Sequence, residues 1–93
     1  MIIGSCFIEL YINGAASLKD KRKILKSIID KIHNTYNVSI AEIDYNDMWH
    51  KAKLGVACVS NQTRQIHSIL NNVINFIERD GRVEIIHYGT NLV

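Results

Sequence analysis

The chain has 93 residues, enough for one small domain with a single core, so we expect one domain over residues 1–93. Hydrophobic residues make up 47% of the chain and charged residues 22%, and this globular composition excludes a disordered or fibrous protein. The net charge of +2 excludes a histone-like chain that is basic throughout.

The first predicted element is a strand over residues 2–12, where the side chains alternate and one face is strongly apolar. A short loop leads to a helix that Ser17 caps, and Asp20, three positions on, reaches back to the Ser17 amide as in a capping box. Asn37 ends this helix. Its apolar stripe consists of Leu18, Leu25, Ile28, Ile29, Ile32 and Tyr36.

Two more strands are predicted next, over residues 38–45 and 51–59. Asn46 and Asp47 form the turn between them. The faces of the first of these strands are ambiguous, whereas the second alternates clearly.

A second helix follows a cap at Ser60 or Asn61, and it ends at Asp80 and Gly81. We expect Gly81 to adopt the left-handed conformation that often ends a helix. The apolar stripe of this helix consists of Ile66, Ile69, Leu70, Val73, Ile74 and Ile77. A fourth strand over residues 82–88 follows, and the last residues are expected to be loose.

The predicted order is strand, helix, strand, strand, helix, strand. Each helix has one apolar side and each clear strand has one apolar face, so the simplest burial packs both helices on one face of a four-stranded antiparallel sheet. This is the α+β, ferredoxin-like βαββαβ sandwich, and right-handed crossovers place the first and third strands at its centre.

This topology gathers basic residues from three loops into a rim at one end of the molecule. We expect the Lys21 chain to pack beside the first apolar stripe and its ammonium to reach solvent. The rim would contact RNA phosphates, although each cation alone is also what a solvated helix surface carries. The residues of the predicted rim are Lys19, Lys21, Arg22, Lys23, Lys26, Trp49, His50, Lys51 and Arg82.

The sheet face away from the helices is a second candidate surface. The third strand offers Gly55, Ala57 and Val59 where an RNA-recognition motif carries aromatic rings, which argues against base stacking there. We expect an apolar patch for a second subunit or a small ligand instead, against the simpler alternative of partial exposure. The patch residues are Phe7, Tyr11, Val59 and Ile86.

The residues that could support catalysis form no defensible pattern. Glu42, Asp44, Asp47 and His50 fit no metal or hydrolase spacing, and Ser17 is better explained as a cap than as a nucleophile. We therefore expect no enzyme activity, no metal and no cofactor. Two distant cysteines and the lack of a long apolar run predict a cytoplasmic protein with reduced thiols and no membrane contact.

Three stretches together carry a resemblance: "SLKDKR" at 17–22, "NVSIAEI" at 37–43 and "DMWHKAKLGVACVSN" at 47–61. The chain resembles the YlxP-like family, small bacterial proteins of uncharacterised function, over nearly its whole length. The resemblance implies a ferredoxin-like fold and, because such genes often lie among translation and ribosome-maturation genes, an RNA or ribosome context. This chain has Asp20 where the family usually has Glu, and His50 where Gln is expected.

The sequence therefore predicts a non-enzymatic module that associates with RNA or a ribosomal subunit through its basic rim. The alternative is a homodimeric or small-ligand-binding module that uses the free sheet face.

Overall fold

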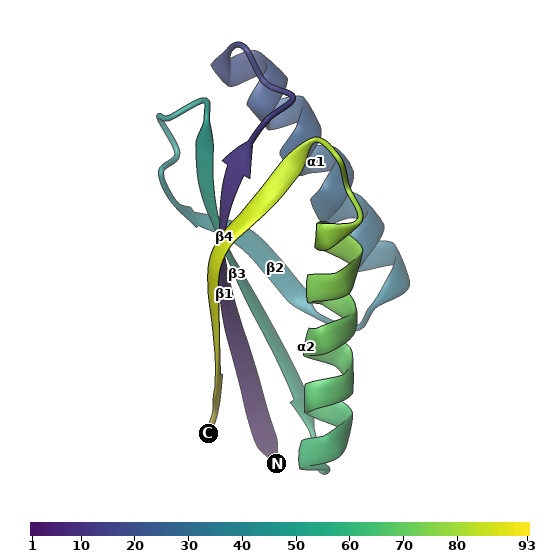
Figure 1. Cartoon of the computed structure of the whole chain (residues 1–93). Helices are drawn as coiled ribbons and strands as arrows, with labels where there is room; N and C mark the ends of the chain where they lie inside the picture. Colours follow the sequence, from purple (N-terminus) through teal and green to yellow (C-terminus); the bar gives the residue numbers. More distant parts are fainter.

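The computed structural model describes residues 1–93, and it has one antiparallel sheet and two helices. The elements are β1 (Ile2–Ile12), α1 (Leu18–Thr35), β2 (Ser39–Asp44), β3 (Lys51–Ser60), α2 (Thr63–Glu78) and β4 (Val83–Leu92). The strand order is β2-β3-β1-β4, and both helices cover the same face (Figure 1). This is the predicted ferredoxin-like βαββαβ fold, with β1 and β3 at the centre.

The core lies between the sheet and the helices. Alternate side chains of β1 and β3 point into it, among them Ile8, Leu10 and Leu54, which are fully buried. The helices add their apolar stripes, and α1 also buries Ile24, which the predicted stripe omitted. The opposite face of the sheet carries no helix, and we call it the open face.

The start of α1 is capped at Ser17. Its hydroxyl accepts a hydrogen bond from the Asp20 amide at 3.1 Å, as predicted. The Asp20 carboxylate accepts from the amide of Ala16 at 3.2 Å, and not from that of Ser17. The carboxylate therefore stabilises the chain one residue before the cap.

Helix α2 approaches the sheet closely at Gly4 on β1. A Cβ atom at this position would overlap Ile66 Cγ2, a buried side chain of α2. The missing side chain of Gly4 is therefore what allows Ile66 to pack directly on the strand.

The ends of α2 differ from the prediction. Gln62 is the residue before the helix and forms no side-chain cap, while the Ser60 hydroxyl accepts a hydrogen bond from the Gln62 amide at 3.1 Å. Gly81 does not have a positive φ, so the predicted left-handed turn is wrong. The turn is held instead by the Asp80 carboxylate, which accepts a hydrogen bond from the Arg82 amide at 3.0 Å.

Strand β4 is longer than predicted, because its last residues are not loose. It pairs with β1 as far as Leu92 opposite Gly4, and Val93 exchanges two backbone hydrogen bonds with Ile3 at 2.8 and 2.9 Å. The register shifts between Glu9 and Leu10. Neither helix is long and apolar enough to cross a membrane.

Candidate nucleic-acid interface

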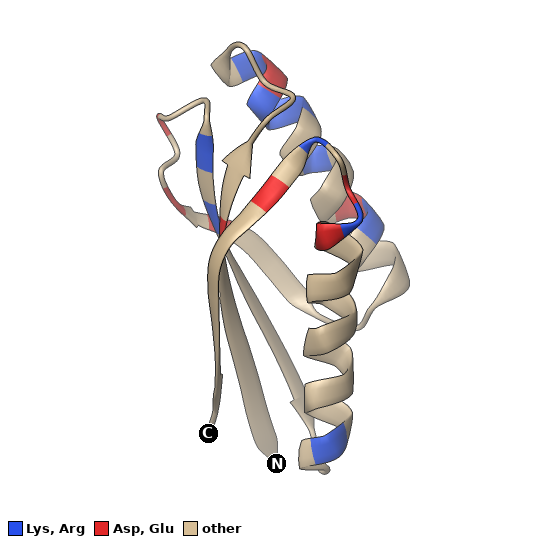
Figure 2. Cartoon of the chain, in the orientation of Figure 1, with Lys and Arg blue, Asp and Glu red and all other residues tan.

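The three loops of the predicted rim meet at one end of the molecule. The Ile12 amide donates to the carbonyl of His50 at 2.9 Å, which joins the end of β1 to the β2–β3 loop. The Gly14 amide donates to the carbonyl of Arg82 at 3.0 Å, which joins the β1–α1 loop to the α2–β4 loop. These loops therefore lie together, as expected. Lys and Arg residues, blue in Figure 2, lie at the beginning of α1 at this end of the molecule.

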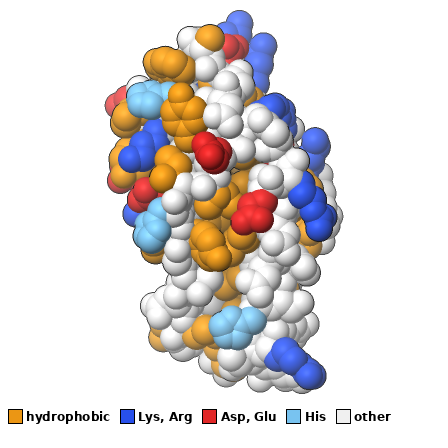
Figure 3. Space-filling view, viewed as in Figure 1, with side chains coloured by type: hydrophobic (Ala, Val, Ile, Leu, Met, Phe, Trp, Pro, Cys, Tyr) orange, Lys and Arg blue, Asp and Glu red, His pale blue; other side chains and the backbone are white.

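Three cations of the rim are exposed and form no ion pair: Lys19, Arg22 and Lys23. We call these three residues the basic cluster. Lys and Arg side chains lie at the end of the molecule where α1 begins and along the outer side of that helix (Figure 3). The positive end of the helix dipole is here, so these cations lie where positive charge is least favourable.

Lys26 continues the same side of the helix but has a partner. Its ammonium lies 2.9 Å from the Asp30 carboxylate, one helical turn on, and its side chain is 77% exposed. An exposed pair of this kind is weak, so a phosphate can compete with Asp30 for the ammonium.

Lys21 does not lie at the surface, which corrects the prediction that its ammonium reaches solvent. Only 1% of the residue is exposed. Its Nζ donates to the carbonyl oxygens of Tyr45 at 2.7 Å and Met48 at 2.6 Å, and it lies 2.7 Å from Glu42 Oε2. The three donors of the ammonium therefore face three protein oxygens, and Lys21 cannot contact a phosphate in this structure.

The contact of Lys21 with Glu42 is an ion pair without a well-aligned hydrogen bond. It is nevertheless the main compensation for burying the ammonium, because the two carbonyls carry only partial charges. The sequence signal was the position of Lys21 beside the apolar stripe, three residues after Leu18 and four before Leu25, which indicated packing but not an acidic partner from another element.

Arg82 is also engaged within the protein. Its guanidinium binds both carboxylate oxygens of Asp80, at 2.9 and 2.7 Å, and donates to the Ser27 hydroxyl at 3.3 Å. The hydrogen bonds that Arg82 donates to the Asp80 carboxylate hold the pKa of Asp80 below its ordinary value, and the same contact raises the pKa of Arg82. Arg82 therefore fixes the α2–β4 loop against α1 and is a poor candidate for phosphate contact.

The β2–β3 loop adds an aromatic group at the same end of the molecule as the start of α1, to which Lys21 ties it. Trp49 is 45% exposed, and its ring lies edge-on to that of His50 at 5.3 Å. His50 is half-buried, and its Nδ1 is buried without a hydrogen-bond partner. Lys51 is half-buried with its ammonium 4.3 Å from the centre of the Tyr45 ring. Of these three side chains, Trp49 is the most exposed.

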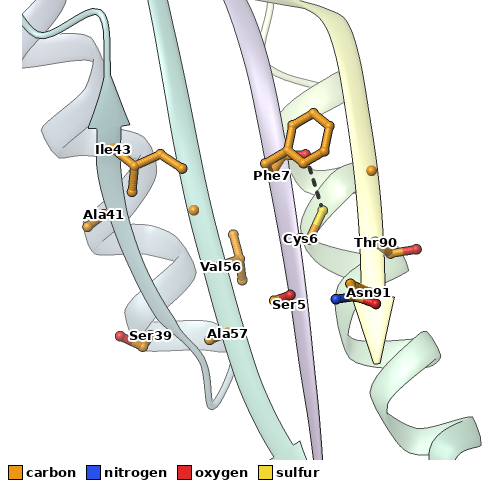
Figure 4. Close-up of a pocket in the computed structure, with 12 residues that line it drawn as sticks. Ser5, Cys6, Phe7, Ser39, Ala41, Ile43, Val56, Ala57, Thr90 and Asn91 are labelled. Atoms are coloured by element: carbon orange, nitrogen blue, oxygen red, sulfur yellow. Dashed lines mark hydrogen bonds between the residues drawn. The ribbon is translucent and has the colours of Figure 1, made fainter. Parts of the chain in front are cut away.

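The open face is hollowed by a shallow groove of about 420 Å³. Phe7 and Ile43 stand at its sides, and its floor is made of small residues of all four strands (Figure 4). Phe7 lies between two strand glycines, Gly55 on β3 and Gly89 on β4. A glycine inside a strand often indicates that another group approaches the backbone closely, and these two glycines were the sequence signal for the groove. The sequence-based prediction of the patch did not use this signal.

The predicted patch is only partly assembled on the open face. Tyr11 and Val59 are 42% and 58% exposed and share this face with Phe7. Ile86 is exposed but lies at the register shift, without a partner on β1, and it does not line the groove. His87 takes the place opposite Glu9, with its ring 5.3 Å from that of Phe7.

Metal-ligating side chains and thiols are two further groups that could carry chemistry. No group of three His, Cys, Asp or Glu side chains lies close enough to hold a metal ion. Both cysteines are buried and free, and burial raises the pKa of Cys6 to about 11. A thiol with such a pKa is almost entirely protonated near neutral pH and is a poor nucleophile.

Comparisons with known proteins agree with the fold. Residues 3–90 match the model of a family described as a protein of unknown function, DUF503. The uncharacterized protein YlxP of Bacillus subtilis is 40% identical over 83 residues, which cover 89% of this chain and 90% of that protein. A de novo designed protein with a ferredoxin fold, solved by NMR, superposes with a TM-score of 0.63 at 17% identity, over 98% of this chain and 86% of the designed one.

Proposed function

Since the chain belongs to the DUF503 family of unknown function, we propose from its own surface that it is a non-enzymatic module that binds RNA or a ribosomal subunit. The supporting observation is the basic cluster, three exposed and unpaired cations in the first turns of α1, with the exposed Trp49 at the same end of the molecule. Such a protein would work in the cytoplasm.

The position of the basic cluster favours an anionic partner. Each cation near a helix start lowers the stability of the helix by about 0.3–1 kcal/mol relative to a neutral residue there. Asp20, the one acidic residue of that turn, offsets only part of this loss. A phosphate backbone bound at the cluster would remove the repulsion and release counterions.

Trp49 gives the surface a way to distinguish a nucleic acid with unpaired bases from other polyanions. An exposed base can stack on an aromatic side chain, with a gain of about 1–3 kcal/mol per base. Unpaired bases in loops and bulges are the RNA features accessible to such stacking. The proposed ligand is therefore structured RNA with an unpaired segment.

Binding to ribosomal subunits and to structured RNA, measured from low to moderate salt, tests this function. The test variant is Arg22→Glu with Lys23→Glu. The matched control is Lys31→Glu with Arg64→Glu, which changes the net charge equally at two other exposed positions. We expect weaker binding by the test variant, and a log–log salt slope shallower by about 0.7–0.9 per lost phosphate contact, while the control keeps the slope.

Two results would contradict the proposal. Equal affinity of the test and control variants would show that the basic cluster is not the site. No binding of the wild-type protein at any salt concentration would exclude the function itself.

A second candidate function is an interaction module that uses the open face to bind another subunit or a small ligand. The groove of about 420 Å³ favours it, because its floor is accessible and its flanking side chains Phe7 and Ile43 are apolar. Volumes of this order are typical of small-molecule sites, and the groove has no charged lining residue, as is common at the centre of subunit contacts.

A further inference from the structure

The strand register makes the open face complementary to a copy of itself. Phe7 on β1 lies directly opposite Gly55 on β3, and Glu9 lies directly opposite Lys53. In the first pair a large ring faces a residue without a side chain. In the second pair an acid faces a base, with 3.8 Å between Glu9 Oε1 and Lys53 Nζ.

We propose that this face binds the open face of a second copy of the chain, about a twofold axis that runs parallel to the strands between β1 and β3. Rotation about this axis places β1 of one copy over β3 of the other at the same level. Phe7 then lies over Gly55 of the partner subunit, and Glu9 lies over Lys53 of the partner subunit. Each contact occurs twice, as in any isologous interface.

Shape supports this arrangement. Gly55 lies on the floor of the groove, and the side chain of Ile43 leans over it from β2, because a Cβ on Gly55 would lie 3.0 Å from Ile43 Cγ2. The ring of Phe7 leans the other way, over Gly89. The groove between Ile43 and the ring of Phe7 therefore has a floor of small residues, and the proposed ring of the second copy would lie in it beside Ile43 (Figure 4).

Charge supports it as well. Glu9 and Lys53 are the charged pair next to the groove, and their side chains are only 20% and 28% exposed. A single face of this kind attracts neither a polyanion nor a polycation. Two copies related by the proposed axis form a ring of four alternating charges, in which every charge has two opposite neighbours.

The size of the face is adequate. Four strands of six to eleven residues, spaced about 4.8 Å apart and rising about 3.3 Å per residue, give a flat area on the order of 600 Å². A stable interface buries about 800 Å² per partner, and projecting side chains enlarge the flat area toward this value. Aligned sheets pack at roughly −30°, so the pairs nearest the axis, those of β1 and β3, stay in contact.

This inference rests on the second candidate function, that the open face is a binding surface, and it is independent of RNA binding. It names the occupant of that surface as a second copy of the chain.

The first experiment measures the mass of the protein by light scattering, up to millimolar concentration. Ala57 is exposed on β3 opposite Ser5, and Ala57→Arg and Ala57→Glu each add a long charged side chain to the middle of the face. We expect a wild-type dimer and two monomeric variants. Tyr88→Arg is the control, because Tyr88 is exposed on β4 opposite Ile8, a core residue, and lies away from the open face. Circular dichroism verifies that all the variants fold.

The second experiment tests the direction of the axis. Glu9→Lys and Lys53→Glu each place like charges opposite each other in a homodimer, so each dimer should dissociate at least about tenfold more readily than wild type. In an equimolar mixture, Lys at position 9 of one chain faces Glu at position 53 of the other. The heterodimer should therefore regain nearly wild-type affinity.

Each outcome decides the proposal. A monomeric wild type, a dimer that both Ala57 variants leave intact, or a mixture without recovery would overturn it. Binding of 1-anilinonaphthalene-8-sulfonate to the wild type separates the two claims. If a monomeric wild type binds this dye and Ala57→Arg does not, the open face is a binding surface with another occupant. If neither binds it, the second candidate function fails too.

Discussion

Lys21 connects two parts of the chain that are distant in sequence. It lies in the first turns of α1, and its ammonium binds the carbonyls of Tyr45 and Met48 in the β2–β3 loop. Tyr45 has a φ of 64°, a left-handed conformation that costs a non-glycine residue on the order of 1 kcal/mol. The ammonium stabilises this turn, so Lys21 helps to hold the loop that carries Trp49 against the start of α1.

Replacing Lys21 by Met should destabilise the protein by about 2–4 kcal/mol, because Glu42 and two carbonyl oxygens lose their shared partner. Urea unfolding measures the loss. Lys19→Met is the matched control, since Lys19 is exposed and unpaired, and its effect should stay within about 0.5 kcal/mol. Adding Glu42→Gln to Lys21→Met should cost little more or restore part of the stability. A loss below 1 kcal/mol for Lys21→Met would contradict the role of the ammonium.

The Asp80–Arg82 pair predicts a pH dependence of stability. Because the Arg82 hydrogen bond lowers the pKa of folded Asp80, the folded state binds this proton less readily than the unfolded state. The stabilisation is present above the unfolded pKa of about 3.9 and is lost as the pH falls through the lower pKa of the folded state. The free energy of unfolding should thus exceed that of Asp80→Asn at pH 7, and the difference should shrink toward zero in strong acid. A constant difference would contradict this linkage.

At the scale of elements, the contact of α2 with β1 depends on Gly4. Gly4→Ala would force Ile66 away from the strand and should destabilise the protein by about 1–3 kcal/mol, as overpacked cores do. Gly81→Ala is a matched control, because a Cβ there meets nothing within 4 Å and φ is not positive. It should be neutral or slightly stabilising. The thermal unfolding midpoints of the two variants should therefore shift in opposite directions from that of the wild type or differ from each other by several degrees.

The elements themselves follow from local patterns, and their ends follow less well. The alternation of apolar residues predicted β1, and the apolar stripe predicted α2, since an element that buries one face has apolar residues at regular intervals. The Ser17 cap was also predictable from its own residues. The end of β4 was not, because its pairing with Ile3 depends on a strand at the other end of the chain.

At the scale of the molecule, the sequence predicted which loops meet but not which charges remain free. Topology brings the β1–α1, β2–β3 and α2–β4 loops together, and the pattern of elements implies topology. The partners of Lys21 and Arg82 depend on side chains that belong to different elements, and contacts of this kind produce no periodic pattern in the sequence. The predicted nine-residue rim thereby reduces to the basic cluster, Trp49 and the weakly paired Lys26 as its accessible part.

The proposed dimer links the two surfaces of the molecule. A twofold axis parallel to the strands leaves the starts of both α1 helices at the same end, so one RNA can contact two basic clusters. Two linked sites bind a long ligand more tightly than one, whereas a short ligand that reaches one site gains nothing.

We therefore expect monomeric Ala57→Glu and Ala57→Arg to bind a long structured RNA at least about tenfold more weakly than the wild type, with a shallower salt slope, because fewer phosphates are contacted. On a short hairpin that spans one cluster, all three proteins should bind within about twofold of one another, since no second site is engaged. Filter binding over a salt series measures both. The opposite charges of the two substitutions at position 57 serve as the control. If Ala57→Arg bound RNA more tightly and Ala57→Glu more weakly, simple electrostatics at the open face would explain the change in RNA affinity. The joint use of two basic clusters would then be wrong.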